Sequence, residues 1–205
     1  MRLHPVRCAA RLVLRALGWT LDVAPPAPPR GVVVVYPHTS NWDFVVGYLA
    51  KVAAGLSLQW IGKDSLFRRP FGGLLRRMGG IPVRRGARSG VIAELAREFA
   101  TRERLWVAIA PEGTRAWVDH WKSGFYHLAL AARVPVGLGI IDWGRRRIEL
   151  RRTLELSGDP EADLRALRAA YQGVRGLRPE RAGEIRFAER EDPAQGQGSR
   201  PIRSN

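Results

Sequence analysis

The sequence predicts an α/β fold, a single layered domain with a mostly parallel central sheet flanked by helices and preceded by an amphipathic N-terminal helix. Short apolar runs rich in β-branched residues, such as Val32–Val35, alternate along the chain with longer segments of helical periodicity. The 205 residues, of which 45% are hydrophobic, suffice to bury one sizeable core. We therefore expect one domain over residues 25–188, between an N-terminal helix within 1–24 and a C-terminal tail over 189–205.

The first 24 residues have the pattern of a basic amphipathic helix. Arg7, Arg11 and Arg15 recur every four residues among leucines and valines. Because these charges interrupt the apolar stretch, it matches neither a cleavable signal peptide nor a membrane span. Such a helix lies on a membrane surface or packs on the domain, and packing is the commoner outcome. The proline-rich segment 25–29 is expected to follow it as an extended linker.

Strands and helices are expected to alternate through the rest of the domain. Apolar runs bounded by Gly, Pro or polar residues predict strands or brief extended segments at 31–36, 58–61, 81–85, 105–110, 134–141 and 147–155. Apolar residues with helical spacing predict helices at 44–54, 66–78, 89–102, 124–133 and 161–174. Gly55 ends the first of these helices, and Pro70 makes the second irregular. Alternation in the last strand predicts an edge position, and the Gly-, Gln- and Ser-rich composition from residue 189 predicts disorder.

A polar turn, His38–Asp43, directly follows the first strand of the domain. In open α/β sheets, ligands bind just beyond the carboxyl ends of the strands, so this turn lies where a site is expected. On one helix, residues five apart would point about 140° away from each other. Across a turn that enters a helix, however, Asp43 can fold back onto His38. A histidine that moves protons needs such a carboxylate to fix its tautomer and to stabilise the imidazolium.

A second polar turn, Pro111–Arg115, follows the strand over 105–110. Glu112, Thr114 and Arg115 are suited to hold a hydroxyl and a phosphate, because a guanidinium binds phosphate through two hydrogen bonds. Taken alone, this segment also reads as a β-turn with a glycine, Gly113, and a solvated arginine. Two polar turns after two buried strands favour a site over coincidence.

Several other kinds of site find little support in the sequence. The four histidines and the one cysteine, Cys8, show no metal-ligand spacing. No serine lies in a Gly-x-Ser-x-Gly setting and Cys8 falls in the N-terminal helix, so His38 is expected to activate a hydroxyl of the substrate instead of an enzyme nucleophile. The formal net charge of +15 predicts an anionic partner, although an arginine-rich composition also arises without any binding role.

With these two turns in place, the sequence resembles a known family, the glycerolipid acyltransferases typified by bacterial 1-acyl-sn-glycerol-3-phosphate acyltransferase. The resemblance covers residues 31–141 and rests on four blocks in the family's order. His38–Asp43 resembles the catalytic His-x4-Asp block, and 80–85 resembles the second block, whose arginine corresponds to Arg85. Residues 112–115 resemble the third block and 134–136 the fourth.

The resemblance implies transfer of an acyl group from a thioester, acyl-CoA or acyl carrier protein, to a lysophospholipid hydroxyl, without a metal or bound cofactor. His38 and Asp43 would be catalytic. Arg85 and the segment Glu112, Gly113, Thr114 and Arg115 would bind the acceptor. The implied location is cytoplasmic, peripheral on the inner face of the cell membrane, with an anionic membrane surface as a partner and no nucleic acid.

Three alternatives remain open. In the first alternative, the same chemistry acts on a different acceptor, such as a lyso-ornithine lipid, a glycolipid or a secondary-metabolite hydroxyl. The positive charge instead binds nucleic acid, although the basic residues are dispersed and match no nucleic-acid-binding signature. In the third alternative, the protein is an inactive relative of these enzymes and only binds the membrane surface. The presence of both His38 and Asp43 argues against that last option. A separate question concerns Phe67 and Phe71, which either insert into lipid or belong to the core.

Overall fold

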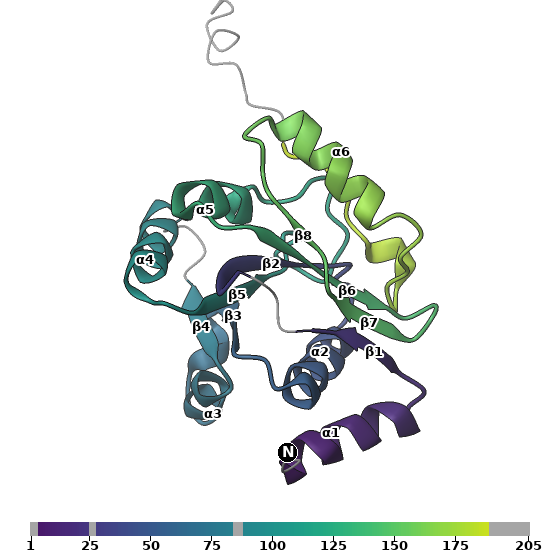
Figure 1. Ribbon diagram of the computed structural model, residues 1–205. Coiled ribbons are helices and arrows are strands. Elements are labelled where there is room, and N and C mark those ends of the chain that lie inside the picture. Colours follow the sequence, from purple (N-terminus) through teal and green to yellow (C-terminus); the bar gives the residue numbers. More distant parts are fainter. Residues whose placement is uncertain (1–3, 25–27, 84–87, 189–205) are drawn as a thin grey trace, which may run out of the picture.

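The computed structural model describes residues 4–24, 28–83 and 88–188 and has the expected layered α/β architecture, in which helices flank a central sheet (Figure 1). Within these residues, eight strands form one sheet. They are β1 (Thr20–Val23), β2 (Arg30–Tyr36), β3 (Leu58–Lys63), β4 (Gly80–Val83), β5 (Leu105–Ile109), β6 (Val136–Asp142), β7 (Arg147–Leu150) and β8 (Thr153–Leu154). The predicted tail from residue 189 and most of the expected linker lie outside the described residues.

The sheet is mostly parallel, as the sequence predicts. Its order is β1-β7-β6-β2-β5-β3-β4, with β8 paired to β6 off this path. Pairing is parallel from β6 through β2, β5 and β3 to β4, and antiparallel where β7 and β8 meet β6. The carboxyl ends of β2, β5, β3 and β4 therefore meet at one edge of the sheet.

Helices cover both faces of the sheet. They are α1 (Pro5–Ala16), α2 (Asn41–Ala54), α3 (Gly72–Arg77), α4 (Arg88–Thr101), α5 (Gly124–Ala132) and α6 (Pro160–Ala170). Figure 1 shows α1, α2 and α3 on one side of the sheet and α4, α5 and α6 on the other. Alternate residues of a strand point to opposite faces, so Val32 and Val34 pack in the core under α4, α5 and α6, while Val33 faces the α2 side.

The N-terminal segment contributes a strand as well as a helix. Thr20–Val23 pairs in parallel with β7 and forms the edge of the sheet. This corrects two expectations, a helix filling residues 1–24 and an edge position for the strand that begins at Arg147. The four residues of β1 include Asp22 and carry too weak a local pattern to predict a strand. Their partner, β7, lies more than 120 residues later in the sequence.

Helix α1 packs on the domain through one face and leaves the opposite face exposed. Ala10 and Leu14 are buried against α2, whereas Leu12 is 69% exposed. The Arg11 Nε donates to the carbonyl of Ala53, 3.0 Å away, at the carboxyl end of α2. The exposed α2 carbonyls attract positive charge, so this arginine caps α2.

The segment after β3 is more broken than the expected helix over 66–78. A short 3₁₀ turn, Asp64–Phe67, is followed by the helix α3, and a cis Arg69–Pro70 bond lies between them. Proline cannot donate a backbone hydrogen bond, which explains the interruption. Phe67 is buried and stacks on Trp60, so it is a core aromatic, whereas Phe71 is 67% exposed.

Candidate active site

The turn after β2 places His38 and Asp43 at the start of α2. Ser40 is the N-cap of that helix, and its hydroxyl accepts from the backbone N–H of Trp42 at 3.2 Å. Asp43 is the third helical residue, and its Oδ2 accepts from the backbone N–H of Ser40 at 2.8 Å. The Ser40 hydroxyl also accepts from the backbone N–H of Asp43, and this contact together with the Asp43–Ser40 bond forms a capping box. The helix thus begins three residues before the predicted start at Phe44, and the cap turns the Asp43 carboxylate back toward the strand.

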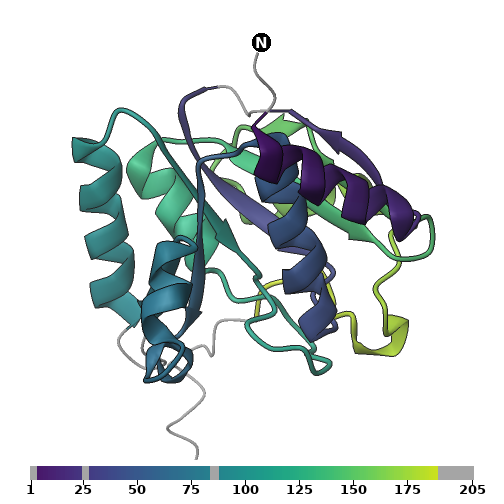
Figure 2. The same ribbon diagram turned by 90° about the horizontal axis from the view of Figure 1, so that it is seen from below.

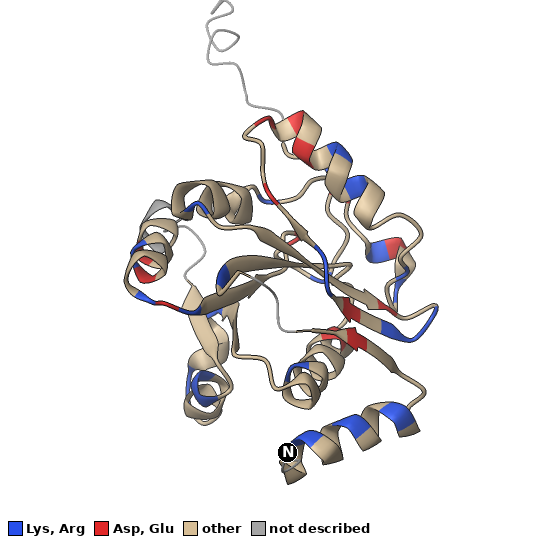
Figure 3. Cartoon of the chain, viewed as in Figure 1, with Lys and Arg blue, Asp and Glu red and all other residues tan. Residues whose placement is uncertain are grey.

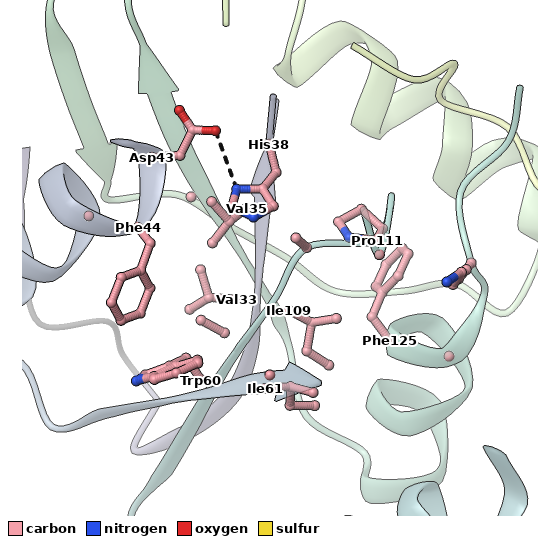
Figure 4. Close-up of a pocket in the computed structure, with 18 of the residues that line it drawn as sticks. Val33, Val35, His38, Asp43, Phe44, Trp60, Ile61, Ile109, Pro111 and Phe125 are labelled. Carbon is pink, nitrogen blue, oxygen red and sulfur yellow. Dashed lines mark ion pairs between the residues drawn. The ribbon is translucent and has the colours of Figure 1, made fainter. Parts of the chain in front are cut away.

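His38 and Asp43 face each other as predicted from their spacing. The His38 Nδ1 lies 3.3 Å from the Asp43 Oδ2 (Figure 4). The Asp43 side chain is fully buried, whereas the His38 ring keeps 17% of its surface exposed. With Nδ1 directed at the carboxylate, Nε2 is the ring nitrogen left for a substrate. This is the arrangement that a histidine general base requires.

Glu112 lies beneath the site and does not line it. Its Oε2 accepts from the backbone N–H of His38 at 2.6 Å, and its Oε1 accepts from the backbone N–H of Gly183 at 2.8 Å. The side chain has no exposed surface. Burial raises the pKa of the Glu112 carboxyl, while the two N–H donors limit that rise. Glu112 was expected to contact the substrate directly, but it does not line the pocket and instead holds the backbone of His38.

Gly113, Thr114 and Arg115 lie on the wall of the same pocket as His38. Gly113 has φ +65°, and a Cβ there would meet the Lys122 side chain, which accounts for glycine at this position. The Thr114 hydroxyl accepts from the backbone N–H of Ala116 at 3.3 Å, and the Arg115 residue is exposed. Arg85, the remaining predicted residue, lies outside the described residues.

The pocket has a volume of about 800 Å³, and its lining is mostly apolar with a smaller polar part. Figure 4 shows the His38–Asp43 pair at one end and aliphatic and aromatic side chains beyond it. These include Val33, Val35, Phe44, Trp60, Ile61, Ile109 and Phe125. An apolar cavity that opens beside a base and its carboxylate partner suits a substrate with a long hydrocarbon part and a reactive polar end.

Three further lysines line this pocket, and one of them, Lys51, donates from its Nζ to the Met78 carbonyl at 2.8 Å. Lys63 ends β3 and Lys122 follows the second polar turn, so both join Arg115 around the pocket. Lys63 is the last residue of a parallel strand, at its carboxyl end, so the rule that selected His38 would also have selected Lys63. Lys122 approaches Gly113 from farther along the chain, and no local motif marks it.

Comparisons with known proteins identify the family and a similar fold. The family model described as Acyltransferase matches residues 23–137, more than half of the chain. The fold is similar to the crystal structure of the 1-acyl-sn-glycerophosphate (LPA) acyltransferase PlsC from Thermotoga maritima, with a TM-score of 0.54 and 17% sequence identity. That similarity covers 81% of this chain and 77% of the other. No curated protein sequence gave a match.

Proposed function

The chain belongs to the acyltransferase family, and from that premise we propose that it transfers an acyl group from a thioester to the hydroxyl of a lysophospholipid. Acyl-CoA or acyl carrier protein would be the donor, and 1-acyl-sn-glycerol-3-phosphate is the proposed acceptor. The observation that carries the proposal is the His38–Asp43 pair on the wall of a largely apolar pocket.

In the proposed reaction, the His38 Nε2 takes the proton of the acceptor hydroxyl while that oxygen attacks the thioester carbonyl. Asp43 stabilises the imidazolium that forms. The tetrahedral intermediate then collapses, the C–S bond breaks, and the imidazolium returns its proton to the departing thiolate. One C–O ester bond replaces one C–S bond, and no covalent enzyme intermediate, metal or bound cofactor takes part.

The two ends of the pocket fit the two parts of the substrates. Arg115 and Lys63 line the pocket and would attract the phosphate of an anionic acceptor, and Arg85 is proposed to join them. The apolar side chains around Trp60 would accommodate acyl chains, because burying hydrocarbon is favourable by roughly 0.8 kcal/mol per methylene. Glu112 and Gly113 would support the acceptor side indirectly, by holding the turn.

We further propose that the face formed by α1, α2 and α3 binds an anionic membrane (Figure 2). Among the described residues, no helix has the length and apolar character to span a bilayer. Leu12 and Leu17 on α1, Trp42 on α2 and Phe71 and Leu74 at α3 are all at least half exposed on these elements. Basic residues accompany them on α1 and α3 (Figure 3). Exposed apolar and basic groups on one face are typical of peripheral membrane binding. We assign the net charge of +15 to that contact and not to nucleic acid.

The direct test is the acyl-transfer rate of the His38→Ala variant with lysophosphatidate and acyl-CoA. Loss of a general base is expected to lower kcat by about 10²–10⁴-fold. His4→Ala, at the exposed start of α1, is the matched control and should retain the wild-type rate. A His38→Ala protein that is folded and fully active would exclude the mechanism.

The acceptor is tested with the same assay. Product formation is compared among lysophosphatidate, an uncharged monoacylglycerol, a lyso-ornithine lipid and a glycolipid, each identified by mass spectrometry. The proposal expects the highest kcat/KM for lysophosphatidate. A preference for the uncharged acceptor would leave acyl transfer intact but remove the assignment of the phosphate-binding residues.

A further inference from the structure

The second carboxylate oxygen of Asp43 has a partner that lies far away in the sequence. Oδ2 accepts from the backbone N–H groups of Thr39 and Ser40 and faces the His38 Nδ1. Oδ1 instead accepts from the indole Nε1–H of Trp143 at 2.7 Å, across 100 residues of sequence. Asp43 is buried, so these donors take the place of water around the charge.

Trp143 is itself held firmly. It directly follows β6, in the interior of the sheet, and its backbone N–H donates to the carbonyl of Arg175 at 2.8 Å. Its ring meets Trp19 edge to face, with ring centroids 4.8 Å apart. The indole nitrogen is thus fixed by the sheet, by the segment after α6 and by the residue that precedes β1. Trp143 also lies beyond residues 23–137, the part that matches the family model.

We propose that Trp143 is a positioning residue of the acyl transfer, and that its indole N–H fixes the plane of the Asp43 carboxylate so that Oδ2 stays directed at His38. This inference rests on the proposed function. The backbone donors hold Oδ2, and the indole N–H holds Oδ1, so rotation about the Cβ–Cγ bond breaks hydrogen bonds at both oxygens. With Oδ1 tethered to Trp143, the orientation of the His38 ring is set before substrate binds.

An indole suits this position better than a cationic donor. The indole N–H only donates and does not titrate in the working range, so Asp43 remains an acceptor on that side. A lysine or arginine would form a charge-assisted bond and neutralise part of the carboxylate. Trp143 orients Asp43 and leaves its negative charge available for the imidazolium.

The test compares Trp143→Phe with Trp106→Phe. Both substitutions keep an aromatic ring and remove one indole hydrogen bond, since Trp106 Nε1 donates to the Pro28 carbonyl at 3.1 Å, away from the site. Hydrogen bonds to charged groups are the stronger class, so Trp143→Phe is expected to lower kcat roughly 10- to 100-fold with little change in KM. Trp106→Phe should retain kcat. A Trp143→Phe enzyme within about twofold of wild type would overturn the proposal.

A double-mutant cycle separates positioning from packing. In an Asp43→Asn background, measured in single turnovers, Trp143→Phe should have no further effect, because the carboxylate that it orients is gone. An equal loss in both backgrounds would show that Trp143 acts only through packing. If Trp143→Phe alone is neutral while His38→Ala is inactive, this inference fails and the proposed function stands. A fully active His38→Ala enzyme would instead remove the proposed function.

A second measurement does not depend on the folding of Trp143→Phe. In the assigned proton–nitrogen NMR spectrum of the wild type, the Trp143 indole proton is expected downfield of the other indole protons because its acceptor is charged. In Asp43→Asn it should move upfield. An indole resonance that is unaffected by Asp43→Asn would exclude the bond in solution.

Discussion

Asp43 takes part both in the cap of α2 and in the proposed catalytic pair. As the third residue of the helix it reaches back to the N–H of Ser40, and the same oxygen faces His38. His38 stands two residues before the N-cap, so the five-residue separation of the pair is the span of the turn plus the first helical residues. A local motif sets this geometry, which is why the sequence alone predicted it.

Glu112 offers a test of positioning at the level of one atom. Glu112→Gln replaces one carboxylate oxygen with an NH₂ group that points at the backbone N–H of His38 or Gly183. Leaving a buried donor without an acceptor is expected to lower the free energy of unfolding by about 1–3 kcal/mol. We also expect kcat to fall, because the His38 backbone loses its anchor. Urea denaturation and the acyl-transfer assay measure the two effects.

Glu94→Gln is the matched control, because Glu94 is exposed on α4 and its substitution should change neither quantity. The difference between wild type and Glu112→Gln should also depend on pH. Burial raises the pKa of Glu112, so the folded protein binds this proton more tightly than the unfolded chain. The stabilising contribution of Glu112 is therefore complete below its ordinary value of 4.5 and is lost as the pH rises through the higher folded-state value. A stability difference between the two proteins that grows as the pH rises would contradict this.

At the scale of elements, α1 provides two leucines that differ only in the face they occupy. Leu14 is fully buried against α2, whereas Leu12 is 69% exposed. Leu14→Ala is expected to lower the free energy of unfolding by about 2–5 kcal/mol, because it leaves a cavity. Leu12→Ala should change it by less than about 0.5 kcal/mol. Chemical denaturation measures the free energy of unfolding of both variants. Equally small changes in the two would show that α1 does not pack on the domain in solution.

Elements with a strong local pattern were predictable, and those that depend on distant pairing were not. The valines of β2 and the helix α4 stand where periodicity places them. The strand β1 becomes an edge strand only because β7 accepts it, and β7 loses its expected edge position for the same reason. Hydrophobic periodicity reports which face of a segment is buried, but it does not identify the partner.

At the scale of the whole molecule, the part that matches the family model does not complete its own site. Residues 23–137 contain His38, Asp43 and Glu112. Their supports come from later in the chain: Gly183 donates to Glu112, and the backbone N–H of Arg178 donates to the Thr39 hydroxyl at 3.2 Å. The polar turns could be predicted from sequence because they are local. These supports could not, because glycine and backbone donors carry no motif.

The proposed membrane face makes a prediction for the intact protein. Co-sedimentation with vesicles that contain anionic phospholipid should exceed co-sedimentation with zwitterionic vesicles, and it should weaken with added salt. Arg15→Glu on α1 is expected to reduce the partition coefficient roughly 30-fold, since each unit charge near an anionic surface contributes about 1 kcal/mol and the reversal changes two. Phe71→Ala should also weaken binding by removing exposed apolar area.

Arg97→Glu is the matched control for this charge reversal. Arg97 is exposed on α4, which packs on the other face of the sheet, so its reversal should leave vesicle binding unchanged. Equal binding to anionic and zwitterionic vesicles would remove the electrostatic part of the proposal. Equal losses from Arg15→Glu and Arg97→Glu would show that overall charge matters and that no particular face is used.

The bond between Gly183 and Glu112 also bears on when the enzyme first becomes active during its synthesis. Gly183 follows Glu112 by 71 residues. A ribosome that adds about 5–20 residues per second needs roughly 4–14 seconds to cover that distance. During that interval the nascent chain contains His38–Asp43 and Pro111–Arg115 but lacks the Gly183 N–H that binds Glu112. Acyl transfer should therefore begin only after the ribosome has added Gly183 and that residue is free to reach Glu112.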